Sequence, residues 1–224
     1  MEDDFKNIVS TDWLAQHLEA PDIRIIDSSW YFPQEKRNAE QEFLECHIPG
    51  ASFFDIDKIK DNDSDLPHML PPSEMFNSTV RKLGIGDGHK VVIYDGLGMR
   101  SAARLWWMFK VFGYSDVVVL DGGFPKWVKE NRSTTAEITE KEIRHLTIYE
   151  DKSIVADRDD VLRATKLNHC SIIDARSEGR FMGTAPEPRS GLRSGSIENS
   201  INVPYETLPV SYTHLTLPTR RGGW

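Results

Sequence analysis

Hydrophobic residues in the first 130 positions form short continuous runs, separated by stretches with helical spacing. The runs are mostly apolar and rich in β-branched residues, and they occupy residues 23–27, 91–94 and 117–120. Such runs are typical of strands buried on both faces of a parallel sheet. The stretches with helical spacing occupy residues 10–18, 73–84 and 101–112. This alternation predicts an α/β fold in which the helices cover the sheet.

The ends of these helices carry recognisable signals. Ser10 or Thr11 is expected to cap the first helix and Ser73 the second, because a hydroxyl oxygen accepts a backbone N–H that has no partner within the helix. Gly113 is expected to end the third helix.

The same pattern occurs twice along the chain. A helix-like stretch followed by an apolar run ends at Asp27 and again at Asp174, 147 residues later. The segment 47–52 has a weaker counterpart at 196–200, displaced by 149 residues. A repeat of this length implies two homologous domains. We place them at residues 1–135 and 153–208, with the charged, threonine-rich stretch 136–152 as a linker.

The second copy is expected to be incomplete. With a displacement of 149, Trp224 corresponds to position 75 of the first copy, so nothing in the second copy matches the strand at 91–94 or the first copy's later elements. Residues 209–224 have no regular periodicity, and we expect them to be a non-native tail. A domain without its middle strand should be poorly ordered, so residues from about 150 onward are expected to be destabilised.

Composition narrows the possible partners and compartment. The 224 residues carry a net charge of -8, which disfavours binding to nucleic acid or to anionic membranes. No run approaches the roughly 18 apolar residues that a membrane span needs. Cys46 and Cys170 are too few for a disulfide framework and favour a reducing, cytoplasmic compartment.

Motifs in both copies resemble those of the two-domain rhodanese-type sulfurtransferases, in particular the 3-mercaptopyruvate and thiosulfate sulfurtransferases. The resemblance covers residues 8 to about 208, and its landmarks lie in family order at 47–51, 53–57, 68–71, 102–108, 121–127, 174–176, 179–181 and 186–189. It implies tandem rhodanese-like domains, each a parallel sheet flanked by helices, with the second domain incomplete.

The implied reaction moves sulfane sulfur from 3-mercaptopyruvate, or from thiosulfate, through a cysteine persulfide to cyanide or to a thiol such as thioredoxin. No metal or organic cofactor is expected. Backbone N–H groups around the cysteine stabilise the negative sulfur. A rival interpretation is a non-catalytic rhodanese-like module that binds a small anion or a protein partner.

The catalytic cysteine itself is missing from the sequence. The family carries it in a Cys-Gly-Ser-Gly-type loop of the second domain, and no such loop occurs here. The equivalent loop of the first copy has Asp95 at the nucleophile position, and a carboxylate cannot hold sulfane sulfur. Neither Cys46 nor Cys170 lies in a loop that leads from a strand into a helix. We therefore expect the chain as given to be inactive and truncated before its catalytic loop.

Two further pairs of residues are candidate site residues through the resemblance. Arg180 and Arg189 match positions that bind the anionic substrate, although their spacing alone fits ordinary solvated arginines. Neighbouring Arg176 and Arg193 are expected to form structural ion pairs.

The second pair is accessory to catalysis. Asp57 and His68 match positions that polarise a serine of the catalytic loop. Without the resemblance, His68 would be an ordinary loop histidine between two prolines.

Overall fold

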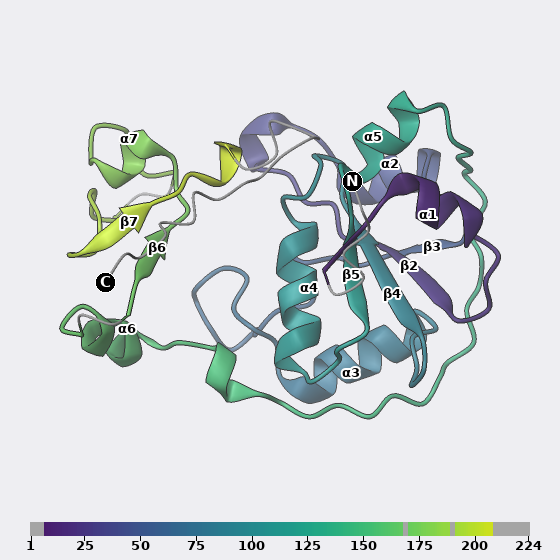
Figure 1. The fold of residues 1–224 in the computed structure, drawn as a ribbon, viewed down its shortest axis with the longest axis horizontal. Helices are drawn as coiled ribbons and strands as arrows, with labels where there is room; N and C mark the ends of the chain where they lie inside the picture. Colours follow the sequence, from purple (N-terminus) through teal and green to yellow (C-terminus); the bar gives the residue numbers. More distant parts are fainter. Residues whose placement is uncertain (1–6, 168–169, 189–190, 208–224) are drawn as a thin grey trace, which may run out of the picture. The chain divides into compact units, whose positions relative to one another are not determined.

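The computed structural model describes residues 7–167, 170–188 and 191–207. The chain divides into two compact units, Met1–Lys152 (unit 1) and Ser153–Trp224 (unit 2). Figure 1 traces the chain through both units.

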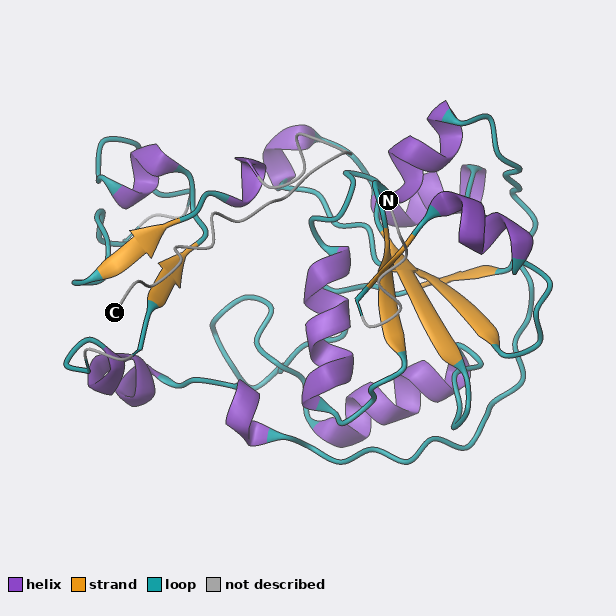
Figure 2. Ribbon diagram, viewed as in Figure 1, coloured by secondary structure: helices purple, strands orange, loops and turns teal. Residues whose placement is uncertain are grey.

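Unit 1 is built around a parallel sheet of five strands with the order β1-β5-β4-β2-β3. The strands are β1 (Ile8–Val9), β2 (Ile23–Asp27), β3 (Ala51–Phe53), β4 (Lys90–Tyr94) and β5 (Val117–Leu120). Its helices are α1 (Thr11–Gln16), α2 (Ala39–Glu45), α3 (Ser73–Lys82), α4 (Ala102–Val111) and α5 (Gly123–Lys129), with a short 3-10 turn at Pro33–Glu35. Helices flank the sheet in Figure 2, and the predicted α/β class is confirmed.

Both faces of this sheet are covered, as the continuous apolar runs predict. Val91 and Ile93 of β4 belong to a buried cluster with residues of α3 and α4. Val92 and Tyr94 belong to a second cluster with residues of α1, α2 and α5. Successive strand residues point to opposite faces, so a central strand between two helical layers needs an apolar residue at every position.

Two of the three predicted helix ends are confirmed, and one is wrong. Ser10 caps α1, because its Oγ accepts the backbone N–H of Trp13 at 3.1 Å. Gly113 follows α4 with a left-handed φ of 77°, a conformation that suits glycine. The expected cap by Ser73 is wrong: Ser73 is the first helical residue, and Pro72 occupies the cap position without a side-chain hydrogen bond.

Residues 136–152 connect the two units without a helix or strand up to Lys152, yet they lie along unit 1. Leu146 is only 3% exposed and packs in the cluster formed by α3 and α4. Asp87 accepts the backbone N–H of Thr147 at 2.9 Å, and the N–H of Tyr149 donates to the carbonyl of Phe112 at 3.1 Å. The predicted linker therefore packs against the rest of unit 1.

Unit 2 contains a parallel sheet of two strands, β6 (Ile172–Asp174) and β7 (Ser200–Asn202). It also contains the helices α6 (Arg158–Ala164) and α7 (Glu178–Phe181) and a 3-10 turn at Tyr205–Thr207, and a further 3-10 turn at Lys152–Ile154 begins at the last residue of unit 1. Among the described residues, every buried apolar side chain belongs to unit 1. Ile173 and Ile201 of the small sheet are 64% and 55% exposed. In the described residues, unit 2 thus lacks an apolar core of its own.

Strand pairing in unit 2 repeats that of unit 1. Ile25 lies opposite Ala51 in the β2–β3 pair, and Ile172 lies opposite Ser200 in the β6–β7 pair. These partners are displaced by the same 147 and 149 residues that relate the two copies in the sequence. In unit 1, β2 also pairs with β4 along its other edge, whereas in the described part of unit 2 β6 pairs with β7 alone.

Candidate functional site

Asp95 lies directly after β4, at the start of the loop that leads into α4. Its side chain is fully buried, and its two carboxylate oxygens accept the backbone N–H groups of Leu97 and Ala102, each at 2.8 Å. A carboxylate that accepts N–H groups at both ends of a loop holds the loop closed and supports the first turn of the following helix. Asp95 therefore has a structural role, and its side chain is not accessible to a substrate.

Asp57 and His68 lie together in unit 1. His68 Nε2 is 2.6 Å from Asp57 Oδ1, and the indole N–H of Trp30 donates to Asp57 Oδ2 at 3.0 Å. The Trp30 ring meets the His68 ring edge-on, with 5.0 Å between centroids. His68 has a left-handed φ of 56°, and its carbonyl accepts a hydrogen bond from the guanidinium of Arg104.

This arrangement has a definite chemical consequence. A carboxylate on Nε2 favours the tautomer that carries its proton there, so Nδ1 presents a lone pair. In that tautomer Nδ1 of His68 is a hydrogen-bond acceptor. Trp30 and Arg104 were not singled out in the sequence, because no local pattern links them to positions 57 and 68.

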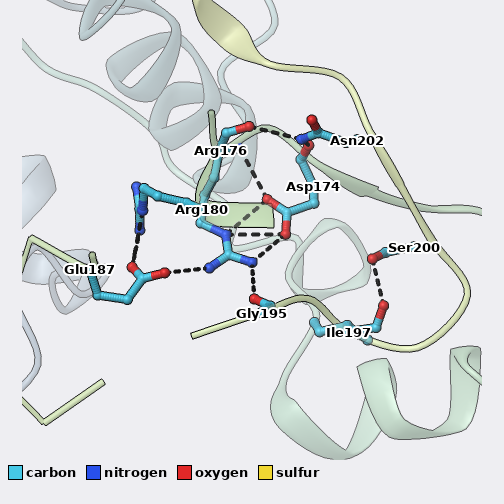
Figure 3. A network of polar contacts seen from close by, with 8 residues as sticks. All are labelled: Asp174, Arg176, Arg180, Glu187, Gly195, Ile197, Ser200 and Asn202. Carbon is cyan, nitrogen blue, oxygen red and sulfur yellow. Dashed lines mark hydrogen bonds and ion pairs between the residues drawn. The ribbon is translucent and has the colours of Figure 1, made fainter. Parts of the chain in front are cut away.

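Arg180 lies on α7 in a network of charged side chains in unit 2 (Figure 3). Its Nε and Nη2 donate to Glu187 Oε2 at 3.0 and 2.6 Å. The other oxygen of Glu187 accepts from Arg176 Nη1 at 2.9 Å. Hydrogen bonding from Arg180 is the largest of the effects that hold the pKa of Glu187 below its usual value. The predicted substrate-binding arginine thus has an internal carboxylate partner.

Arg176 anchors this network to the sheet. Its guanidinium donates to both oxygens of Asp174 at the end of β6, with contacts of 2.6 to 3.1 Å, and to the carbonyl of Gly195 at 2.7 Å. The expectation that Arg176 forms structural ion pairs is confirmed. The described residues show no ion pair for Arg193, which was expected to behave in the same way.

Each unit has a surface pocket lined by some of the residues named above. One of about 480 Å³ in unit 2 is lined by β6, Arg176 and the segment 193–197. Another of about 230 Å³ in unit 1 lies where β2 ends, and Asp27, Tyr31 and Cys46 are among its lining residues.

The remaining sequence-based candidates lie elsewhere. Arg189 falls outside the described residues. Cys46 and Cys170 are both free, exposed thiols. Within the described ranges, no group of three or more His, Cys, Asp or Glu side chains is placed to hold a metal ion, and no helix is long and apolar enough to cross a membrane.

The model of the rhodanese-like domain matches residues 10–130, which is more than half of the chain. The chain belongs to the rhodanese family. The 3-mercaptopyruvate sulfurtransferase of Rattus norvegicus is 40% identical over 207 residues, a region covering 90% of this chain and 70% of the relative. The thiosulfate sulfurtransferase of Bos taurus is 41% identical over 208 residues, with the same coverage.

Solved structures agree with the sequence relatives. SseA of Escherichia coli, described as a 3-mercaptopyruvate sulfotransferase with the rhodanese fold, superposes with a TM-score of 0.80 at 39% identity. The superposition covers 88% of this chain and 74% of SseA. By family, then, this chain is a sulfurtransferase.

Proposed function

We propose that this chain carries the anion-binding part of a sulfurtransferase that takes sulfane sulfur from 3-mercaptopyruvate or thiosulfate. The observation that supports it most directly is Arg180, whose guanidinium is fixed by Glu187 on two nitrogens while Nη1 has no partner among the described residues. A planar cation held in this way suits a carboxylate, because two parallel N–H groups meet two oxygens.

In the proposed reaction a cysteine thiolate attacks the sulfur of the donor. With 3-mercaptopyruvate the carbon–sulfur bond breaks, and its electron pair leaves as the enolate of pyruvate, which then takes up a proton. With thiosulfate the sulfur–sulfur bond breaks and sulfite leaves. An acceptor thiolate or cyanide next attacks the outer sulfur of the persulfide, which returns the cysteine as a thiolate.

The proposal gives the described residues separate roles. Arg180, with Arg189, holds the carboxylate and carbonyl of the donor. His68, oriented by Asp57, polarises a serine hydroxyl of the cysteine loop. That loop does not occur in the sequence given, and the buried Asp95 takes the place of its cysteine in unit 1.

A first test measures turnover by the chain as given. We expect no thiocyanate from 3-mercaptopyruvate or thiosulfate with cyanide, because no cysteine lies in a loop of the required kind. Turnover that persists through purification and disappears in Cys46→Ala or Cys170→Ala would contradict this account.

A second test separates the enzyme from the binding module. The coding sequence beyond residue 208 in the source genome is read in frame. A Cys-Gly-Ser-Gly-type loop downstream supports the sulfurtransferase proposal, and a stop codon in place of that loop supports a non-catalytic anion-binding module.

A further inference from the structure

The hydrogen bonds of Arg180 use one particular edge of its guanidinium group. Nε and Nη2 both donate to the same oxygen of Glu187, at 3.0 and 2.6 Å. Nη2 carries two hydrogens, so one N–H of Nη2 and both of Nη1 remain beyond this contact. One N–H of Nη1 and the remaining N–H of Nη2 form the end-on edge of the group, which can meet a carboxylate with two parallel hydrogen bonds.

Glu187 is held more firmly than the arginine it contacts. Its side chain is 4% exposed, against 27% for Arg180, and its second oxygen is bonded to Arg176. Arg176 is in turn bonded to Asp174 at the end of β6 and to the carbonyl of Gly195. Figure 3 shows this continuous path from the sheet to Arg180. The orientation of the Arg180 guanidinium is therefore set by the sheet through Glu187.

We propose that Glu187 is a positioning residue for substrate binding: it occupies the side-on edge of Arg180 and leaves the end-on edge to receive the carboxylate of a 2-oxo acid. This inference rests on the proposed function, in which Arg180 binds the donor. Glu187 divides its two oxygens between two guanidinium groups, so it fixes Arg180 without being its exclusive counterion. The donor then meets a cation whose orientation is already set, which lowers the entropic cost of binding.

Glu187 could instead compete with the donor for Arg180, and the two roles predict opposite effects of a Glu187 variant on anion affinity. If Glu187 competes with the donor for Arg180, removing its charge strengthens anion binding. If it positions Arg180, removing its charge weakens binding, because the guanidinium gains alternative orientations. The sign of the change in affinity decides between the two.

The test uses the full chain labelled with ¹⁵N-arginine, with pyruvate as the probe. Variants are Glu187→Gln, Arg180→Ala, and Glu178→Gln as the matched control, because Glu178 is an exposed carboxylate on the same helix with no ion pair among the described residues. We expect Glu187→Gln to weaken pyruvate binding at least about tenfold, or about 1.4 kcal/mol. Glu178→Gln should leave the affinity within about twofold.

Hydrogen exchange of the Arg180 side chain reports directly whether Glu187 fixes the guanidinium group. The Nε–H signal of Arg180, identified by its loss in Arg180→Lys, should exchange slowly in the unchanged chain and in Glu178→Gln, and rapidly in Glu187→Gln. If Glu187→Gln disturbs the amide spectrum of unit 2, Glu187→Asp replaces it. This variant keeps the charge but shortens the side chain, and it should also weaken binding and accelerate exchange.

The outcomes separate the inference from the function it rests on. Unchanged or tighter pyruvate binding in Glu187→Gln, with binding lost in Arg180→Ala, overturns the positioning role and leaves the proposed function standing. Unchanged binding in Arg180→Ala, or no binding by the unchanged chain, overturns the anion-binding function and the inference together.

Discussion

Asp27 at the end of β2 is a buried carboxyl group whose ionisation should weaken unit 1. Its side chain accepts the backbone N–H of Ser29 at 2.8 Å, and the residue is only 5% exposed. Burial, the largest effect, raises the pKa of Asp27 from its usual 3.8 to about 6, against the lowering effect of the Ser29 and Tyr94 hydrogen bonds. The folded state therefore favours the protonated form.

The size and direction of the effect follow from linkage. A pKa higher in the folded than in the unfolded state gives stability that is complete below pH 3.8 and is lost as the pH rises to about 6. At about 1.4 kcal/mol for each pKa unit, the whole loss is about 3 kcal/mol, of which about 2 kcal/mol falls between pH 4 and 7. Asp27→Asn removes the titration, so the variant should gain that amount relative to the unchanged chain over the same interval.

The measurement is urea unfolding of both proteins between pH 4 and 8. It is followed by tryptophan fluorescence, for which Trp127 is a fully buried probe in unit 1. Any fixed cost of the asparagine cancels, because only the change of the stability difference with pH is used. The control is Asp87→Asn. Hydrogen bonding from Thr147 lowers the pKa of this exposed carboxyl. The difference in unfolding free energy between this variant and the unchanged chain should therefore change only slightly with pH, and in the opposite direction. A difference for Asp27→Asn that stays constant from pH 4 to 7 would refute the reasoning.

Three further predictions concern stability. Asp95→Ala should destabilise unit 1 by about 3 kcal/mol, because it removes the acceptor of the buried Ala102 N–H and of the partly buried Leu97 N–H. In the same urea assay the exposed Asp116→Ala should cost under about 1 kcal/mol. Leu146→Ala should cost about 2 to 4 kcal/mol and Ile143→Ala almost nothing, because only Leu146 is buried in the core; equal effects would contradict the packing of this segment. Limited proteolysis should cut beyond residue 152 first and leave unit 1 intact, and uniform resistance of unit 2 would show that it is stably folded.

Much of the fold was predictable because unit 1 follows local rules throughout. Each run that was apolar at every position became a strand covered on both faces, and Ser10 became the cap that its side chain allows. The segment 136–152 was harder, because its few apolar residues follow no regular spacing within a charged stretch, and the burial of Leu146 depends on a surface formed by distant helices. Periodicity reports only regular elements, so an extended segment held by a few side chains and backbone hydrogen bonds is missed.

The candidate site was less predictable than the fold. The resemblance identified Arg180 and His68, but no pattern in the sequence paired them with Glu187 and with Trp30. Those partners lie 7 and 38 residues away, and chain folding rather than a local pattern brings them together. A motif therefore indicates which residues bear chemistry, while their orientation depends on neighbours that the motif does not contain.

Asp27 and Asp174 show how far a repeat determines chemistry. Asp27 ends β2 and Asp174 ends β6. Both accept the backbone N–H of the residue two positions later, at 2.8 and 3.0 Å. Yet that residue is Ser29 in one unit and Arg176 in the other. Burial raises the pKa of Asp27, whereas hydrogen bonding from the guanidinium of Arg176 lowers the pKa of Asp174. The duplicated backbone turn thus places a carboxyl group with a raised pKa in unit 1, and in unit 2 a carboxyl group with a lowered pKa that is hydrogen-bonded to Arg176. Arg176 at this position links Asp174 at the end of β6 to Glu187, which accepts hydrogen bonds from Arg180.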